Sequence, residues 1–236
     1  MSDSRKEQLS LNLARVRDRI QQAALAVGRD PEEITLVVVT KYFPASDVRL
    51  LAGLGVGDVG ENKHQEASAK VAECAEVPVR WHFIGGIQSN KAAQIAGYAD
   101  VVQSVDRIKL VSRLAQGAGA RQSPLEVLIQ VSLDSHDQGN ANRQGIDPEQ
   151  VAALADLIAQ TPALELRGVM GVAPLGVQPE PAFTKLAAIS QELRTQHPAA
   201  TWISAGMSGD LEAAISAGAT HVRVGSGILG PRPVMK

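Results

Sequence analysis

The chain has 236 residues, of which 44% are hydrophobic and 3% aromatic, so it is long enough for one sizeable core filled mainly by aliphatic side chains. Its formal net charge is −2, from 23 basic and 25 acidic residues without a long block of one sign, which argues against nucleic acid or a membrane as a partner. The single cysteine, Cys74, excludes an internal disulfide. With no apolar leader segment and no apolar run of membrane-spanning length, the sequence favours a cytoplasmic protein.

The first predicted element is a helix over residues 4–27, in which apolar residues recur at helical spacing and Gly28 marks the end. Residues 34–40, ITLVVVT, form a short β-branched run typical of a strand covered on both faces. From there, strand-like and helix-like segments alternate along the chain. The eight predicted strands are 34–40, 58–62, 80–85, 100–105, 125–133, 166–172, 201–206 and 221–227, with seven helical segments between them.

This alternation predicts βαβ units and a parallel sheet. Eight such units in a chain of this size are typical of an α/β fold of the (β/α)₈ type, the TIM barrel. Only a short segment follows the last predicted strand, so the N-terminal helix is expected to complete the outer ring. No linker divides residues 1–236, which are expected to form a single domain. An open doubly wound sheet is the alternative, because strand count alone does not exclude it.

In such a barrel, the carboxyl ends of the strands and the loops after them form the functional face. Candidate residues at these positions are Lys41, Glu61, Asn62, Met207, Ser208, Arg223, Gly225 and Ser226. They are expected to converge, because the eighth strand lies beside the first when the barrel closes. The five histidines lack the spacing of metal ligands, so no metal site is expected.

Two glycine-bearing segments predict a phosphate site. In SAGMSGDLEAAI, Ser208 is expected to cap a helix, and the N–H groups of Gly209 and Asp210 are expected to face an anion. In RVGSGILG, bare backbone at Gly225 lies next to the hydroxyl of Ser226. Either segment alone is more often an ordinary turn. Their places after the seventh and eighth strands, where barrels frequently bind phosphate, favour the phosphate interpretation.

Lys41 beside such a site suggests covalent chemistry. A lysine amine near a phosphate site is the arrangement for a Schiff base with a phosphorylated aldehyde. Burial and neighbouring positive charge favour the neutral amine that attacks a carbonyl, and Arg223 is the candidate neighbour. A lysine that merely extends into solvent from a strand end is the alternative.

Six segments together resemble the pyridoxal phosphate homeostasis proteins, small relatives of the alanine racemase barrel. They are VVVTKYFP, GENKHQEA, RWHFIGGIQSNKA, RGVMGVAP, ISAGMSGDLEAAI and HVRVGSGILG. The resemblance runs in family order from about residue 9 to residue 230. It implies a (β/α)₈ barrel that holds pyridoxal 5′-phosphate (PLP) on Lys41.

The same resemblance implies cofactor-binding roles for Lys41, Asn62, Met207, Ser208, Gly209, Arg223, Gly225 and Ser226. The serines and glycines would hold the phosphate, Asn62 and Met207 would line the cofactor, and Arg223 would approach the pyridine nitrogen. A permanently cationic guanidinium there disfavours a proton on that nitrogen, which makes the cofactor a poor electron sink. Racemases of this lineage carry a second domain with a catalytic base, usually a tyrosine, which this sequence is expected to lack. Tyr42 and Tyr98 are poorly placed to substitute, so no residue is expected to be catalytic.

The implied function is to carry or buffer PLP and so support intracellular PLP and amino-acid homeostasis, without established catalytic activity. Apo forms of PLP-dependent enzymes are candidate partners, and a monomer is expected. Two alternatives stay open: a PLP-dependent amino-acid racemase of fold type III, and an aldolase-type barrel enzyme that uses Lys41. Residues 134–147 depart from the family pattern, because Arg143 precedes Gln144 and Gly145 where the family commonly has a lysine–glycine pair.

Overall fold

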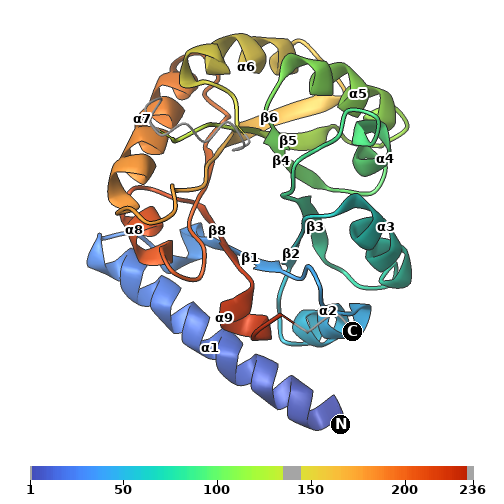
Figure 1. Ribbon diagram of the computed structural model, residues 1–236, viewed down its shortest axis with the longest axis vertical. Coiled ribbons are helices and arrows are strands. Elements are labelled where there is room, and N and C mark those ends of the chain that lie inside the picture. The colour runs from blue at the N-terminus through green and yellow to red at the C-terminus, as the bar shows by residue number, and fades with distance from the viewer. Residues whose placement is uncertain (1, 135–144, 233–236) are drawn as a thin grey trace.

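The computed structural model describes residues 2–134 and 145–232, and its strands close into a ring (Figure 1). Within these residues, eight parallel strands pair in chain order, and the first strand also pairs with the last. The strands are β1 (Thr35–Val39), β2 (Asp58–Glu61), β3 (Arg80–Phe83), β4 (Val101–Val105), β5 (Leu125–Gln130), β6 (Leu164–Met170), β7 (Trp202–Ser204) and β8 (His221–Val224). The predicted (β/α)₈ barrel is therefore confirmed, and the open sheet is excluded.

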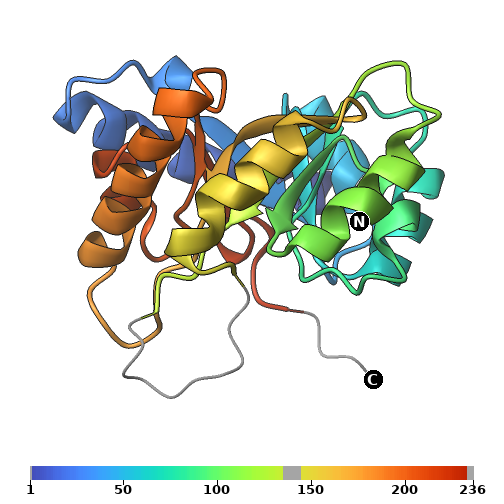
Figure 2. The same ribbon diagram turned by 90° about the horizontal axis from the view of Figure 1, so that it is seen from above.

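Helices form the outer layer around this ring (Figure 2). They are α1 (Ser2–Ala26), α2 (Ala45–Gly53), α3 (His64–Glu73), α4 (Ala92–Ala96), α5 (Ile108–Ala118), α6 (Val151–Ala159), α7 (Glu180–Gln196), α8 (Leu211–Ser216) and α9 (Ser226–Leu229). Two short 3₁₀ helices cover Pro31–Glu33 and Pro148–Gln150. In the described part of the chain, no helix combines the length and the apolar character needed to cross a membrane.

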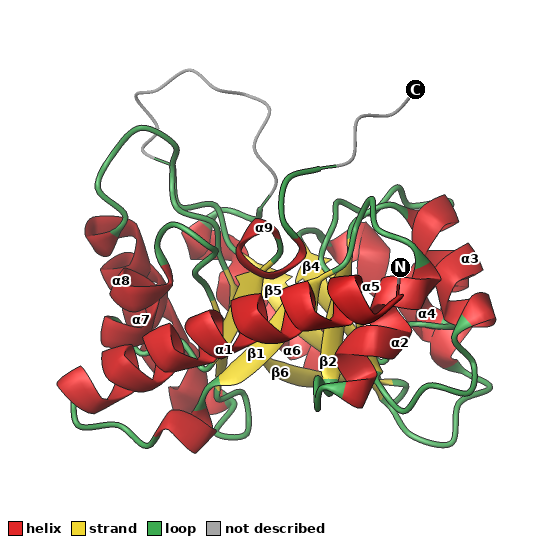
Figure 3. Cartoon of the chain, turned by 90° about the horizontal axis from the view of Figure 1, so that it is seen from below, coloured by secondary structure: helices red, strands yellow, loops and turns green. Residues whose placement is uncertain are grey.

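Helix α1 takes the place in the outer ring that the short α9 cannot fill. It contacts α8, α9 and α2, and in Figure 3 it crosses the barrel in front of β1. Its buried side chains share one apolar cluster with residues of α8 and α9: Leu9, Leu13, Val16, Ile20, Ala24, Leu211, Ile215, Ile228 and Leu229. Gly28 adopts φ +70° just after the helix, as its expected capping role requires. The predicted position of the N-terminal helix is thus confirmed.

Side-chain alternation along β1 and β2 decides which residues face the barrel interior. A Cβ added at Gly60 would meet Val37 and Val39, whereas Val38 and Val59 belong to the apolar cluster beneath α1 and α2. Successive strand residues point to opposite faces. Lys41, two positions after Val39, therefore continues the series of inward-facing residues at the mouth of the barrel.

Most strands end one to three residues before their predicted ends. The predicted strand 125–133 ends at Gln130, and the predicted strand 166–172 runs from Leu164 to Met170. β6 starts early because Leu164 pairs with Leu125 across the sheet. Residues that leave the strands at their carboxyl ends become the loops that carry the candidate site.

Candidate functional site

A cavity of about 310 Å³ opens at the carboxyl ends of β1, β7 and β8, and it is called the mouth pocket below. Its lining residues are Val39, Lys41, Tyr42, Phe43, Ile84, Met207, Ser208, Gly209, Arg223, Gly225, Ser226, Gly230 and Arg232. They include every predicted cofactor-binding residue except Asn62. The backbone of Asn62 lies against Gly85 at the end of β2, where a Cβ on Gly85 would come within 1.9 Å of the Asn62 carbonyl oxygen. The cavity has the size of a small-molecule site, since such sites start at about 300 Å³.

The loops after β7 and β8 meet through their serines. Ser208 Oγ accepts a hydrogen bond from the Gly227 N–H at 3.3 Å and lies 3.4 Å from Ser226 Oγ. The expected capping role of Ser208 is wrong, because α8 begins at Leu211 with Asp210 at its N-cap. The Asp210 N–H is also not free for an anion, since it donates to the Met207 carbonyl at 3.3 Å. The Gly209 N–H and the two serine hydroxyls, all on glycine-bearing turns, stay as candidate donors to an anion.

Arg223 brings a buried cation to the inner side of the mouth pocket. Its side chain is buried, and its Nη1 and Nη2 groups donate to Ser204 Oγ at 2.7 Å and to the Gly171 carbonyl at 2.9 Å. Burial lowers the pKa of Arg223 to about 10, against the raising effect of Asp210. The guanidinium therefore stays charged at neutral pH.

Lys41 lies in a turn that its neighbours hold tightly. Tyr42 adopts φ +71° and is the sole non-glycine residue with positive φ in the described part of the chain. Such a conformation costs about 1–3 kcal/mol and is kept only where surrounding contacts fix it. One contact is the Tyr42 N–H, which donates to the Glu66 carboxylate, and another is the Thr40 N–H, which donates to the Gly60 carbonyl at 3.0 Å.

Three cations surround the ring of Tyr42 at the rim of the pocket. Lys41 Nζ lies 5.9 Å from the ring centroid, Lys63 Nζ lies 5.4 Å away, and Arg232 Cζ lies 5.2 Å away. These separations are within the range of cation–π attraction. The rim is therefore positively charged around Lys41, which suits an anionic ligand.

A buried ion pair behind the Lys41 turn was not foreseen. Lys70 Nζ lies 2.5 Å from Glu61 Oε1 and 3.1 Å from Glu66 Oε1, and it donates to the Thr40 carbonyl at 2.8 Å. Burial raises the pKa of Glu61, and the positive charge of Lys70 opposes this rise. The expectation that Glu61 joins the mouth is wrong, because alternation along β2 turns it outward, beneath α3. That alternation was the available signal, whereas nothing in the sequence distinguishes Lys70 from a surface lysine.

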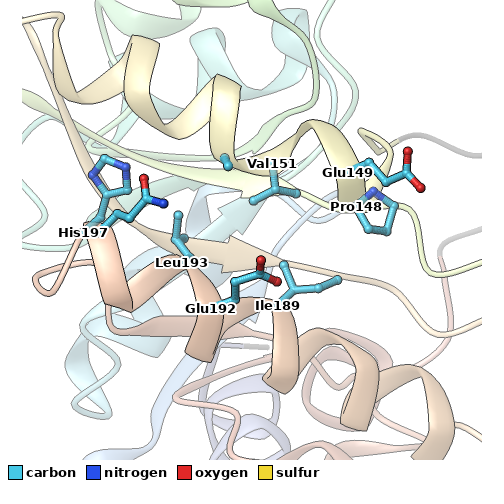
Figure 4. A pocket seen from close by; sticks show the side chains of 9 residues that line it. Pro148, Glu149, Val151, Ile189, Glu192, Leu193 and His197 are labelled. Carbon is cyan, nitrogen blue, oxygen red and sulfur yellow. The ribbon is translucent and has the colours of Figure 1, made fainter.

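Another pocket, of about 290 Å³, lies on the outer surface between α6 and α7 (Figure 4). Its lining includes Glu149, Glu192 and His197, and His197 Nε2 lies 3.0 Å from Asp156 Oδ1. Neither a lysine nor an arginine lines it, so it does not suit a phosphorylated aldehyde. The described residues also contain no group of three or more histidine, cysteine or acidic side chains that could hold a metal ion.

Comparisons with known proteins show the family to which the chain is similar. A family model described as the alanine racemase N-terminal domain matches residues 11–233. The chain is 42% identical to a pyridoxal phosphate homeostasis protein of Mycobacterium tuberculosis, over 97% of this chain and 94% of that one. It is also 42% identical to a protein of the same name from Pseudomonas aeruginosa, over 94% of each.

A solved structure is similar as well. PipY of Synechococcus elongatus, whose structure has PLP bound, is 32% identical and superposes with a TM-score of 0.81. The match covers 94% of this chain and all of PipY. The similarity therefore extends over most of the chain.

The Lys70→Met variant tests the buried ion pair. Loss of the ammonium leaves the Glu61 carboxylate buried without its cation, so the free energy of unfolding should fall by about 3–5 kcal/mol in urea denaturation. The double variant Lys70→Met/Glu61→Gln should recover part of this loss, because the uncompensated charge is gone. Lys109→Met, at an exposed position of α5, is the matched control. A loss for Lys70→Met no larger than that of the control would contradict the assignment.

Proposed function

The chain belongs to the family of pyridoxal phosphate homeostasis proteins, and we propose that it binds PLP in the mouth pocket and carries or buffers it. One observation carries the proposal: Lys41 and the two serine- and glycine-bearing turns line the same cavity. A phosphorylated aldehyde needs an amine and an anion site within one small molecule's reach. The PLP that is bound in the similar PipY supports the same choice of ligand.

The residues present fit PLP at both ends. Ser208 and Ser226 offer hydroxyl donors to a phosphate, and Gly209 and Gly225 let its oxygens approach the backbone. PLP supplies an aldehyde and an electron-withdrawing ring. Lys41 would hold the cofactor through its side-chain amine, a link to the aldehyde whose formation releases one water molecule. We assign Met207 to the cavity wall and Asn62 to the pocket edge.

Arg223 favours storage of the cofactor over catalysis with it. Its guanidinium is cationic and is fixed by Ser204 and Gly171, so it can face a ring nitrogen without giving up a proton. A ring nitrogen that stays unprotonated draws electrons weakly from bound groups. The family name, which denotes homeostasis, agrees with a protein that acts without catalytic turnover.

Residues 1–236 are proposed to act as one PLP-binding domain, supported by the closed barrel and by α1 packed along it. A cytoplasmic location suits the buried free thiol of Cys74. We further propose that a monomer passes PLP to apo enzymes. Exposed apolar side chains of Val172, Leu175 and Val177, in the loop after β6 on the mouth side of the barrel, support such a contact. Residues 135–144, which hold most of the departure from the family pattern, lie outside the described residues.

The Lys41→Ala variant tests the covalent link. Wild-type protein incubated with PLP should show the absorbance of a Schiff base, and borohydride reduction should fix the label on the peptide that contains Lys41. Lys41→Ala should show neither result, because no other lysine among the described residues lines the mouth pocket. Lys63→Ala, at the same rim, is the matched control and should retain the label. A covalent label that survives in Lys41→Ala would refute the assignment.

The Ser208→Ala variant tests the phosphate turns. Loss of a hydroxyl that binds a charged phosphate should raise the Kd for PLP about tenfold, as measured by fluorescence titration. The Kd for pyridoxal, which lacks the phosphate, should not change. Ser216→Ala, at an exposed position of α8, is the control. Equal losses for both ligands would place the phosphate elsewhere.

Deuterium exchange tests the racemase alternative. Alanine and other amino acids are incubated with concentrated PLP-loaded protein in heavy water, and exchange at Cα is followed by proton NMR. The proposed role predicts no exchange above that of free PLP with Lys41→Ala protein. Rapid exchange that depends on Lys41 would instead establish catalysis.

A further inference from the structure

A line of polar side chains crosses the barrel interior, a region that aliphatic residues dominate in most barrels of this type. It consists of Arg223, Ser204, Gln103, His82 and Asp58, and it is called the interior relay below. The first four are at least 96% buried, with relative exposures of 4%, 0%, 0% and 1%. Because an unsatisfied polar group at such a depth is costly, each of these side chains needs a partner inside the barrel.

The upper half of the interior relay begins at the mouth pocket. Arg223 Nη1 donates to Ser204 Oγ at 2.7 Å, and Ser204 Oγ donates in turn to Gln103 Oε1 at 2.6 Å. Guanidinium groups have donors but no acceptor, so the first bond can run in only one direction. The serine hydroxyl accepts a hydrogen bond from the guanidinium and donates its own O–H to Gln103, toward the middle of the barrel.

The lower half runs in the same direction. Gln103 Nε2 lies 2.9 Å from His82 Nδ1, and His82 Nε2 lies 2.8 Å from Asp58 Oδ1. A carboxylate only accepts, so His82 carries its proton on Nε2 and uses Nδ1 to accept from the amide. Every hydrogen bond therefore points from the buried cation toward the acid.

The far end of the interior relay meets water on the opposite side of the barrel. Asp58 is the first residue of β2 and lines a cavity of about 640 Å³ together with Thr35 and Gly57. Burial raises the pKa of Asp58, but the hydrogen bond from His82 and the charge of Arg80 outweigh this effect and lower it. The acid is therefore ionised near neutral pH and ends the relay with a negative charge.

We propose that Ser204, Gln103, His82 and Asp58 are positioning residues that hold the Arg223 guanidinium against the ring nitrogen of bound PLP. The proposal rests on the proposed function. Hydrogen bonds that run in one direction between opposite charges polarise each other, so the whole relay resists rotation of the guanidinium. Its effect is to keep a cation, and not an acid, beside the ring nitrogen, and so to keep that nitrogen unprotonated.

The test follows the ring nitrogen directly, with ¹⁵N-labelled PLP bound to each protein and observed by NMR. Ser204→Ala removes the acceptor of Arg223 Nη1. The ring-nitrogen resonance should move toward that of protonated pyridine, and PLP release to an excess of an apo enzyme should accelerate about three- to tenfold, the effect of one hydrogen bond. Asp58→Asn keeps an acceptor for His82 but removes the charge, and should shift the resonance in the same direction by less.

Ser190→Ala is the matched control. Ser190 Oγ is as deeply buried, on α7, and has no hydrogen-bond partner in the described part of the chain. It should leave both the resonance and the release rate unchanged. Thermal unfolding of each complex checks the fold, and Gln103→Met cuts the interior relay at its centre if Ser204→Ala does not fold.

Two results would overturn the inference. An unchanged ring-nitrogen resonance in Asp58→Asn would do so whatever Ser204→Ala shows, because the acid would then have no influence on the site. Equal shifts of the ring-nitrogen resonance in Ser190→Ala and Ser204→Ala would show that any loss of a buried hydroxyl loosens the barrel and that the interior relay has no specific role. Wild-type protein that takes up no PLP would refute the proposed function itself, a result distinct from both.

Discussion

Hydrogen bonds between β1 and β8 bring the two halves of the site together. The register pairs Val38 with Val224, so Gly225 comes against Val39, and Lys41 follows two residues after Val39 at the same mouth. The chain separates these residues widely, and only closure of the ring makes them neighbours. Helix α1 supports that closure from outside, because its apolar face covers the junction where α9 is too short to do so.

Alternation along the strands sorts polar residues into two systems on opposite sides of the barrel wall. Inward residues of β2, β3, β4, β7 and β8 build the interior relay, which runs from Arg223 at the mouth to Asp58 at the opposite side. Glu61, which faces outward from β2, pairs with Lys70 of α3, and Lys70 also donates a hydrogen bond to the Thr40 carbonyl. The interior relay reaches the mouth pocket through Arg223, and the outer ion pair fixes the turn that carries Lys41. Both are buried, so the loss of a partner in either system is costly.

The sequence allowed the barrel and the common placement of Lys41 and the two serine-bearing turns to be predicted, because each depends on a local pattern. Strand periodicity identifies Lys41 as a residue that follows a buried strand, and glycines identify the turns. The cap at Asp210 was missed because a helix start can shift by a residue or two. The outward direction of Glu61 was missed although alternation along β2 indicates it. The interior relay could not be predicted, since its members come from five strands and meet only through side-chain lengths and neighbour order.

The left-handed backbone at Tyr42 makes the direction of the Lys41 side chain depend on α3, a helix that does not line the mouth pocket. Glu66 and Lys70 lie on α3, and their contacts hold the turn in a conformation that Tyr42 would not adopt alone. A fluctuation that lifts α3 from the barrel would therefore free the turn while the ring of strands stays closed. Local opening of this kind requires less free energy than global unfolding. The direction of the Lys41 side chain is thus fixed by α3, and these contacts can open while the barrel strands stay paired.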